Sequence, residues 1–449
     1  MREVDWLLHS ADWVVTCDPA MRCVRPGAVA IEGEEIVAAG PSDELRRTFR
    51  GRKEMDLSGH LLLPGLVNTH THAAMSVFRG MGDDLPLGNW LRDVIFPAEA
   101  AAVSPDMVYW GTLLSAVEML KGGTTTFCDG YFFEEHAARA ALDAGMRAVL
   151  GQGVLDFPAP DQPDPKKSRA RVEEFFAAFP AGEARLRPSI FCHAPYTCGS
   201  ETLRWVKELC RQNGILFQMH LSETAGEVRE IVAKTGMRPA VYLEHLGILD
   251  PMTLCVHAVW LDSREIEILA QTGAAVSHCP ESNMKLGSGV ARVTDMIAAG
   301  VRVGLGTDGC ASNNNQDMLS EMDKAAKLEK VFRRDPVAGP ARKVLHLATL
   351  GGAEALGLGR ETGSIEPGKK ADLAAIDLNQ PHLFPVYDPV SLLVYSARAG
   401  DVRHVWVSGR QVVADGGVTT VSETEAMDQV RKIARKCGVC WEMGKIAGE

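Results

Sequence analysis

The chain has 449 residues, of which 46% are hydrophobic, and it carries a formal net charge of −11 at pH 7. Acidic and basic residues are interleaved without a basic run, which argues against nucleic acid and anionic membranes as partners. No apolar run reaches membrane-spanning length and the N-terminus lacks the apolar core of a signal peptide, so we expect a soluble, cytoplasmic protein. Its eleven cysteines should be reduced, including the CxxC pair Cys437 and Cys440. The oligomeric state stays open, a homo-oligomer included.

Both ends of the chain have the pattern of short β-strands. Residues 1–59 contain apolar runs separated by turn residues, as in WLLHSADWVVTCDP and GAVAIEGEEIVAAGP. Segments of the same kind, KKADLAAIDL and VRHVWVSGRQVVADGG, occur after residue 362, and one helix is expected over SETEAMDQVRKIARK. We predict that residues 1–59 and 363–449 together form a small β-sandwich domain that also carries the terminal helix.

The middle of the chain, residues 60–362, alternates short apolar runs with amphipathic helical stretches that often end in glycine. This alternation is expected for βα units around a parallel sheet. The apolar runs lie at 61–70, 124–129, 146–154, 187–194, 215–222, 252–258, 273–279 and 301–308. Eight strands, most of them followed by a helix, are the number in a (β/α)₈ TIM-type barrel. The predicted fold class is therefore α/β, with a barrel catalytic domain beside the small β-sandwich domain.

Candidate metal ligands stand at the ends of these predicted strands. In PGLVNTHTHAAMS, His70 and His72 are two residues apart, so on a strand their side chains project in the same direction. His220 and Asp308 lie near the ends of the fifth and eighth runs, and such barrels carry their active sites at the C-terminal ends of the strands. Three histidines, one carboxylate and a water suit a single divalent ion, Zn²⁺ in preference to Fe²⁺. A lone strand-end histidine is more often only hydrogen-bonded, so the prediction depends on all four residues occurring together.

Further polar residues fall at the same edge. His193, His257 and His278 lie near the ends of the fourth, sixth and seventh runs, and we expect a structural role for His278. Glu223, three residues after the fifth-strand histidine, should lie at the mouth of the barrel, where a carboxylate beside a metal can transfer protons. A glutamate at a helix N-terminus is also favoured without any function, and we prefer the functional interpretation because of the strand end that precedes it.

Five stretches together, PGLVNTHTH, HLSET, VHAVWL, HCPESNMKLGSG and GLGTDGCASNN, resemble the amidohydrolase superfamily, specifically its deaminase branch with a single metal. The likeness extends from the N-terminal β segment to GSIEPGKKADLAAIDL. Within the branch, FRGMGDDLPLGNWLRDVIFPAE and HCPESNMKLGSG look most like the 5'-methylthioadenosine/S-adenosylhomocysteine deaminases. The resemblance implies a metal-dependent hydrolase that converts an adenine-type nucleoside (5'-methylthioadenosine, S-adenosylhomocysteine, adenosine or 5'-deoxyadenosine) to the inosine derivative and ammonia.

The resemblance also implies roles for individual residues. The metal would be bound by His70, His72, His220 and Asp308. The proton transfers and the orientation of the attacking hydroxide would be carried out by Glu223, His257 and Asp308. The purine nucleoside would be contacted by Trp90, which would stack on the base, by Glu99, which would accept hydrogen bonds from the ribose hydroxyls, and by His193, Glu223 and Asp308. Without the resemblance, a core tryptophan and a helix-surface acid are equally good interpretations of Trp90 and Glu99.

One position departs from the pattern of the branch. An arginine commonly follows the third strand there and can meet a carboxylate on the 5' side of the substrate. This chain has Gln152 at that place, and only Arg169 or Arg171 as loose counterparts of a second arginine. A neutral amide does not replace the charge and the forked donors of arginine. We therefore expect Gln152 to face the 5' side of the substrate and the homocysteine carboxylate to be recognised poorly.

Two other functions stay open at this point. The same metal and Glu223 would also serve the hydrolysis of another N-heterocycle, such as 8-oxoguanine, a pterin or a chloro- or amino-triazine; a ribose-binding Glu99 is the feature that distinguishes the two. A barrel retained as a non-enzymatic scaffold would be expected to have lost metal ligands, and all four are present.

Overall fold

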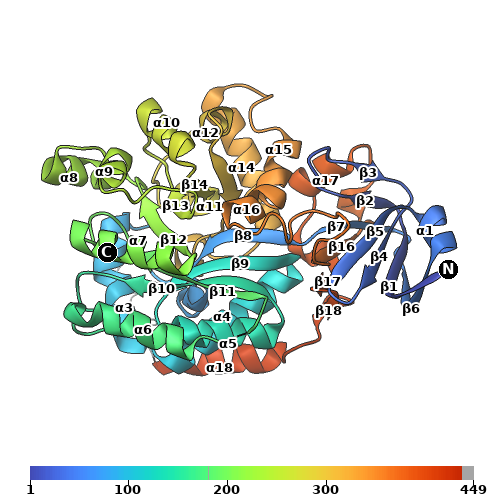
Figure 1. The fold of residues 1–449 in the computed structure, drawn as a ribbon, viewed down its shortest axis with the longest axis horizontal. Helices are drawn as coiled ribbons and strands as arrows, with labels where there is room; N and C mark the ends of the chain where they lie inside the picture. Colours follow the sequence, from blue (N-terminus) through green and yellow to red (C-terminus); the bar gives the residue numbers. More distant parts are fainter. Residues whose placement is uncertain (181, 437–449) are drawn as a thin grey trace, which may run out of the picture.

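A computed structural model describes residues 1–180 and 182–436; Cys437 and Cys440 lie outside the described residues. Its centre is an eight-stranded parallel sheet in the order β15-β14-β13-β12-β11-β10-β9-β8, rolled into a nearly closed barrel (Figure 1). The eight predicted strands are confirmed with small shifts at their ends. Their bounds are β8 (Leu66–Thr71), β9 (Thr124–Tyr131), β10 (Arg147–Val154), β11 (Leu186–Cys192), β12 (Leu216–Leu221), β13 (Thr253–His257), β14 (Ala275–His278) and β15 (Arg302–Leu305).

Side chains and loop backbone join the first and last strands of the barrel. Thr69 donates its hydroxyl to the carbonyl oxygen of Leu305 at 2.8 Å. Just beyond β15, the backbone N–H of Asp308 donates to the carbonyl oxygen of His70 at 3.0 Å. The two strands approach so closely that a Cβ on Gly304 would lie 2.4 Å from Cγ2 of Thr69, so only glycine fits there. This seam holds the ends of β8 and β15, which carry candidate metal ligands, next to each other.

Helices cover the outside of the barrel. Several begin with a side-chain cap, such as the Asp262–Glu265 capping box, and end at a left-handed glycine, such as Gly145 or Gly214. No helix within the described residues combines the length and apolarity needed to cross a bilayer. The helices are α4 (Pro105–Lys121), α5 (Glu134–Ala144), α6 (Ser168–Ala178), α7 (Ser200–Asn213), α8 (Ala225–Thr235), α9 (Pro239–His245), α10 (Ser263–Thr272), α11 (Pro280–Lys285), α12 (Val293–Ala298), α13 (Cys310–Asn313), α14 (Met318–Arg333), α15 (Ala341–Leu347) and α16 (Leu350–Ala355), with the short turn η3 (Pro165–Lys167) before α6.

Both chain ends contribute to two further sheets, which lie together at one end of the molecule (Figure 1). One has four strands in the order β5-β4-β1-β6, and the other has seven in the order β19-β18-β17-β16-β7-β2-β3. Their strands are β1 (Arg2–Ala11), β2 (Trp13–Val15), β3 (Cys23–Val24), β4 (Gly27–Glu32), β5 (Glu35–Pro41), β6 (Phe49–Asp56), β7 (His60–Pro64), β16 (Leu373–Asp377), β17 (Val402–Val407), β18 (Arg410–Ala414) and β19 (Gly417–Val418), with α1 (Ser42–Thr48), η4 (Pro381–Leu383), α17 (Pro389–Tyr395) and η5 (Ala399–Asp401) between them.

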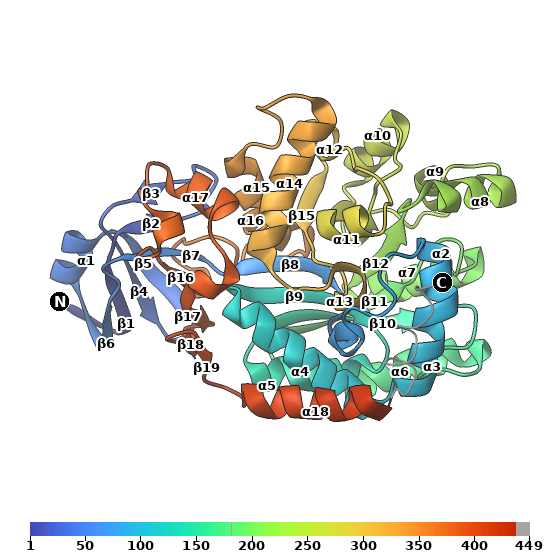
Figure 2. The same cartoon turned by 180° about the vertical axis from the view of Figure 1, so that it is seen from behind.

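The facing surfaces of these two sheets share one apolar core. Trp6 of β1 packs edge-on against Trp406 of β17, with ring centroids 6.1 Å apart, and Leu8, Ile31 and Leu373 are buried in the same cluster. The terminal helix α18 (Glu423–Lys436) leaves the sheets and packs against α4 of the barrel (Figure 2). The sequence boundaries after residues 59 and 362 stay a prediction.

The apolar run at 61–70, which we expected to form one strand, is divided between two sheets. β7 pairs with β2 and β16, whereas β8 begins the barrel. The division falls at Gly65, where a Cβ would lie 2.1 Å from the Thr125 hydroxyl oxygen. A continuous apolar pattern does not reveal such a division, because both halves are buried.

Candidate metal centre and active site

A cavity of about 530 Å³ lies at the C-terminal ends of the barrel strands. Part of its wall is polar and is formed by His72, His193, His220, Glu223, His257 and Asp308. The remaining wall is mainly apolar and includes Leu91, Ile95, Phe96, Leu155, Phe157, Pro158 and Pro160. Three of these residues come from a segment after β8 that contains η1 (Ala73–Phe78), α2 (Leu87–Trp90), η2 (Leu91–Ile95) and α3 (Phe96–Ala102), and the other four follow β10. The cavity is therefore suited to a ligand with one polar, reacting end and a larger apolar surface.

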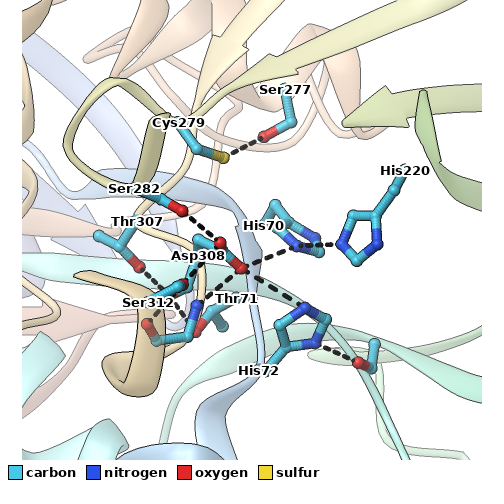
Figure 3. A network of polar contacts seen from close by, with 12 residues as sticks. His70, Thr71, His72, His220, Ser277, Cys279, Ser282, Thr307, Asp308 and Ser312 are labelled. Carbon is cyan, nitrogen blue, oxygen red and sulfur yellow. Dashed lines mark hydrogen bonds and ion pairs between the residues drawn. The ribbon is translucent and has the colours of Figure 1, made fainter. Parts of the chain in front are cut away.

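The four predicted metal ligands converge on one point. One donor atom from each of His70, His72, His220 and Asp308 can be chosen so that all lie within 4.8 Å of one another. Nε2 of His70 and Nε2 of His72 each lie 3.4 Å from Oδ1 of Asp308, and Nε2 of His70 lies 3.3 Å from Nε2 of His220. Figure 3 shows the three imidazole rings arranged around the carboxylate. Three nitrogens and one oxygen at this spacing fit a single divalent ion.

The protonation states of the histidines suit a cation. Burial lowers the pKa of His70 to about 4, and burial also lowers the pKa values of His72 and His220. Neutral imidazoles are the form that binds metals. His72 donates its Nδ1 hydrogen to the carbonyl oxygen of Gly130 at 2.6 Å, which leaves the lone pair of Nε2 directed at the centre.

Asp308 is held in an ionised form and in a fixed orientation. Its Oδ2 accepts hydrogen bonds from the hydroxyls of Ser282 and Ser312, each at 2.7 Å, which leaves Oδ1 directed at the histidines. Burial acts to raise the pKa of Asp308, but the hydrogen bond to His70 holds it well below its usual range. Sequence reasoning missed both serines, because they stand in the short helices α11 and α13 after β14 and β15, which are too short for a periodic pattern to indicate which side chains point inward.

Glu223 and His257 lie on the other side of the polar wall. Oε2 of Glu223 is 3.8 Å from Nε2 of His257, and Oε1 accepts from the hydroxyl of Ser288 at 3.3 Å. His257 donates its Nδ1 hydrogen to Oδ1 of Asn283 at 3.0 Å, so its Nε2 is the nitrogen that faces the cavity. Burial raises the pKa of Glu223, which makes this carboxyl better able to hold a proton than an exposed glutamate.

His193 and the neighbouring Phe191 form the floor beside the metal ligands. The His193 ring packs edge-on against His220 with centroids 5.0 Å apart, and burial lowers its pKa to about 3. Phe191 contacts the rings of all three metal-binding histidines. A Cβ on Gly130 would lie 2.6 Å from Cγ of Phe191, so the glycine permits this packing. His278, in contrast, is buried at the end of β14 and does not line the cavity.

Trp90 and Glu99 both line the cavity and are both buried. The Trp90 indole donates to the carbonyl oxygen of Met81 at 3.0 Å, which fixes the plane of its ring. Oε1 of Glu99 accepts the hydroxyl of Tyr131 at 2.7 Å. Burial raises the pKa of Glu99 to about 7, and the bond from Tyr131 acts against this rise. Tyr131 also lies near His72, with ring centroids 6.2 Å apart, so Glu99 is one side chain away from the metal centre.

Gln152 and the two arginines considered with it do not line the cavity. The Gln152 side chain is fully buried behind the wall and donates to Oδ2 of Asp161 at 2.8 Å. Arg171 forms ion pairs with Asp161 and Glu135 at 3.0 and 2.6 Å, and the Arg169 guanidinium lies 5.0 Å from the ring centroid of Trp205. Among the described residues that line the cavity, none is a lysine or an arginine.

The proposed metal centre predicts that replacing His70 and replacing His278, two buried histidines at strand ends, will affect metal content and activity differently. His70→Ala should lose the metal and the activity together, because it removes one of four ligands. His278→Ala removes a buried imidazole outside the ligand group and should retain one metal per chain. Metal analysis of both purified variants, together with a rate assay, tests this; full activity in a metal-free His70→Ala protein would contradict the assignment.

Comparisons with known proteins agree with this geometry. The model of the Amidohydrolase family matches residues 61–412. A 5-methylthioadenosine/S-adenosylhomocysteine deaminase of Syntrophobacter fumaroxidans is 47% identical, covering 94% of this chain and 96% of the relative, and a 5'-deoxyadenosine deaminase of Methanothermobacter thermautotrophicus is 42% identical, covering 90% and 93%. The crystal structure of an adenosine deaminase from Xanthomonas campestris with bound zinc superposes with a TM-score of 0.95 at 36% identity, covering 97% of this chain and 99% of that one. With a family match over most of its length and these near full-length relatives, the chain belongs to the amidohydrolase family.

Proposed function

We propose that the chain catalyses the hydrolytic deamination of an adenine-type nucleoside to the inosine derivative and ammonia, with one divalent ion per chain. The observation that carries the proposal is the content of one cavity, which combines the three histidines and Asp308 with Glu223 and with a buried Glu99. The relatives named as deaminases of such nucleosides support the same substrate class. Zn²⁺ is the proposed ion, because a solved relative is described with bound zinc and because the donor set suits it.

The proposed chemistry begins with attack of hydroxide on the ring carbon that bears the amino group. A divalent ion held by His70, His72, His220 and Asp308 would lower the pKa of water to about 7 and so would provide hydroxide at neutral pH. Asp308 is the group that accepts the proton of the attacking water, since its carboxylate is kept ionised. His257, whose Nε2 faces the cavity, orients the attacking oxygen. Both residues are fixed by neighbours, Ser282 and Ser312 in one case and Asn283 in the other.

Glu223 is proposed to protonate the purine ring. Attack on an aromatic C–NH₂ carbon disrupts the ring, and a proton delivered by Glu223 to the adjacent ring nitrogen lowers the barrier. The proton that Asp308 took from the water then passes to the amino nitrogen, the C–N bond breaks, and ammonia leaves. Burial, which raises the pKa of Glu223, favours the protonated form that can donate. The same carboxylate lies 3.8 Å from Nε2 of His257, so the two groups are close enough to act on one substrate.

The remainder of the nucleoside is assigned to the apolar wall and to Glu99. Trp90 would stack on the purine, His193 would contact the base, and Glu99 would accept the ribose hydroxyls through its free Oε2 while Tyr131 holds Oε1. A carboxylate that accepts two hydroxyls is a strong, directional contact. Trp90 and Glu99 are held by Met81 and Tyr131 before any ligand binds, which lowers the entropy lost on binding.

The 5' substituent is assigned to the apolar wall formed by Leu155, Phe157, Pro158 and Pro160. Phe157 packs beside Phe96, with ring centroids 6.2 Å apart, and Phe96 precedes Glu99 by three residues in α3. This wall therefore continues from the proposed ribose site. Gln152 points away from this wall, so we do not expect it to face the 5' side. We propose instead that the apolar wall residues determine which 5' substituent is accepted.

The proposed location is a reducing compartment such as the cytoplasm. The nine cysteines within the described residues are all free, and eight of them are buried. Buried cysteines that form no disulfide within the described part of the chain are typical of such compartments.

Replacing Glu223 with glutamine tests the proton assignment. Glu223→Gln keeps the shape of the side chain but cannot donate an acidic proton, so turnover should fall by at least about 100-fold, the lower end of the usual contribution of a positioned acid. The metal content should stay at one ion per chain, since Glu223 is not a ligand. A variant that works within a few-fold of wild type would remove Glu223 from this role.

Glu99→Gln tests the ribose contact and its pH dependence. The loss should be about 2–4 kcal/mol of transition-state binding, as for a charged hydrogen-bond partner removed from a buried site. Because the pKa of Glu99 is raised to about 7, the carboxylate is protonated below that pH, and the advantage of wild type over the variant should shrink as the pH falls through 7 and grow above it. The measurement is kcat/KM for adenosine across this range.

The matched control for this experiment is a change in the substrate. With 2',3'-dideoxyadenosine, which lacks both hydroxyls, wild type and Glu99→Gln should differ little at any pH. If the variant deaminates adenosine as well as wild type, Glu99 does not bind the ribose.

The apolar wall predicts the preferred 5' group. 5'-Methylthioadenosine, 5'-deoxyadenosine and adenosine should have kcat/KM values at least as high as S-adenosylhomocysteine, because a buried carboxylate without a cationic partner is unfavourable. 5'-Butylthioadenosine has a long 5' substituent without charged groups, so it separates the effect of substituent length from that of charge. Its kcat/KM should be higher than that of S-adenosylhomocysteine. A strong preference for S-adenosylhomocysteine over all of these would contradict the assignment of the wall.

A further inference from the structure

Glu227 is a buried acid near the active site that the mechanism above does not use. It is the third residue of α8, and only 6% of its surface is exposed. Both of its carboxylate oxygens point back out of the helix. Oε1 accepts the backbone N–H of Ser222 at 2.8 Å, and Oε2 accepts the backbone N–H of Glu223 at 2.7 Å.

This arrangement differs from ordinary helix capping. In a capping box, a glutamate at the third helical position accepts the backbone N–H of the cap residue itself. Here the cap is Thr224, whose hydroxyl accepts the N–H of Glu227 at 3.2 Å, while the glutamate reaches one and two residues further back. Glu227 therefore binds the turn that leads from β12 to the helix, the turn that carries Glu223.

The turn held by Glu227 is strained. Ser222 has φ of +51°, a left-handed conformation that costs residues with a side chain about 1 kcal/mol or more. Within the described residues, the Ser222 hydroxyl is buried without a hydrogen-bond partner, so the side chain itself does not stabilise this conformation. The backbone does: its N–H donates to Glu227, and its carbonyl oxygen accepts the N–H of Trp260 at 2.9 Å.

We propose that Glu227 is a positioning residue for the reaction: by holding the left-handed turn at Ser222, it directs the Glu223 carboxylate into the cavity. This rests on the proposed role of Glu223. Within the described residues, the Glu223 carboxylate accepts one long hydrogen bond, from Ser288 at 3.3 Å, and lies 3.8 Å from Nε2 of His257, so its place is set mainly by the backbone that Glu227 holds. The contacts proposed for the base and the ribose come from other elements and do not depend on this turn.

The test compares Glu227→Ala with a neighbour on the same helix. Glu227→Ala should lower kcat for 5'-methylthioadenosine by about tenfold to a hundredfold, the usual effect of a misplacement of about 1 Å. KM should change by less than about threefold and one metal ion per chain should remain, because the groups that bind substrate and metal are untouched. Glu230→Gln, on the exposed face of α8, should behave as wild type.

A second variant separates positioning from general stability. Glycine adopts positive φ without strain, so adding Ser222→Gly to Glu227→Ala should recover at least about threefold of the lost kcat. A purely structural role for Glu227 predicts no such recovery. The proposal is overturned if the glycine restores nothing, or if Glu227→Ala loses the metal or raises KM as much as it lowers kcat.

Failure of the Glu227 proposal can be distinguished from failure of the proposed deaminase function. If wild type deaminates no nucleoside, that function fails, and the Glu227 comparison is then made with whichever N-heterocycle the wild-type protein hydrolyses, since Glu223 is needed in either reaction.

Discussion

The seam between the first and last strands of the barrel is the constraint on which the site depends. Two of the four metal ligands come from β8 or the residue after it, and Asp308 follows β15, so they meet only because these strands lie side by side. The seam holds because Gly304 lets the strands approach, Thr69 bonds across it, and the N–H of Asp308 donates to His70. The last bond fixes the backbone of one ligand directly to the backbone of another. The metal centre and the closure of the barrel are thus one feature of the fold.

Burial sets the chemistry that this centre can carry out. Withdrawal from water keeps the ligand histidines neutral, whereas the surrounding hydrogen-bond donors keep Asp308 ionised. The same desolvation raises the pKa values of Glu223 and Glu99. Glu223 is proposed to donate a proton to the base, and Glu99 is proposed to accept hydrogen bonds from the ribose hydroxyls. Burial therefore raises the pKa of both carboxyl groups. Their different roles follow from their neighbours, which are His257 for Glu223 and Tyr131 for Glu99.

The strands and metal ligands could be predicted from the sequence because both follow simple patterns. Apolar runs of strand length mark the barrel, and the ligands stand at the ends of those runs, where a parallel barrel brings side chains together. Gln152 lies on β10, where the strand pattern alone does not decide which way its side chain points. Gly153 and Val154, the next two residues, both line the cavity, so only the hydrogen bond to Asp161 shows that Gln152 is directed away from it.

Other features could not be found from sequence patterns. Ser282, Asn283 and Ser312 stand in the short helices α11 and α13, which are too short for a helical period to show in the sequence. Glu227 has the appearance of an ordinary acid in the first turn of a helix, and only its contacts distinguish it from one. The most direct test of the account is a titration of metal-free protein with Zn²⁺ while ammonia release from 5'-methylthioadenosine is recorded. The account predicts no release without metal and a linear rise that ends at one zinc per chain; activity without metal, or a break at two, would contradict it.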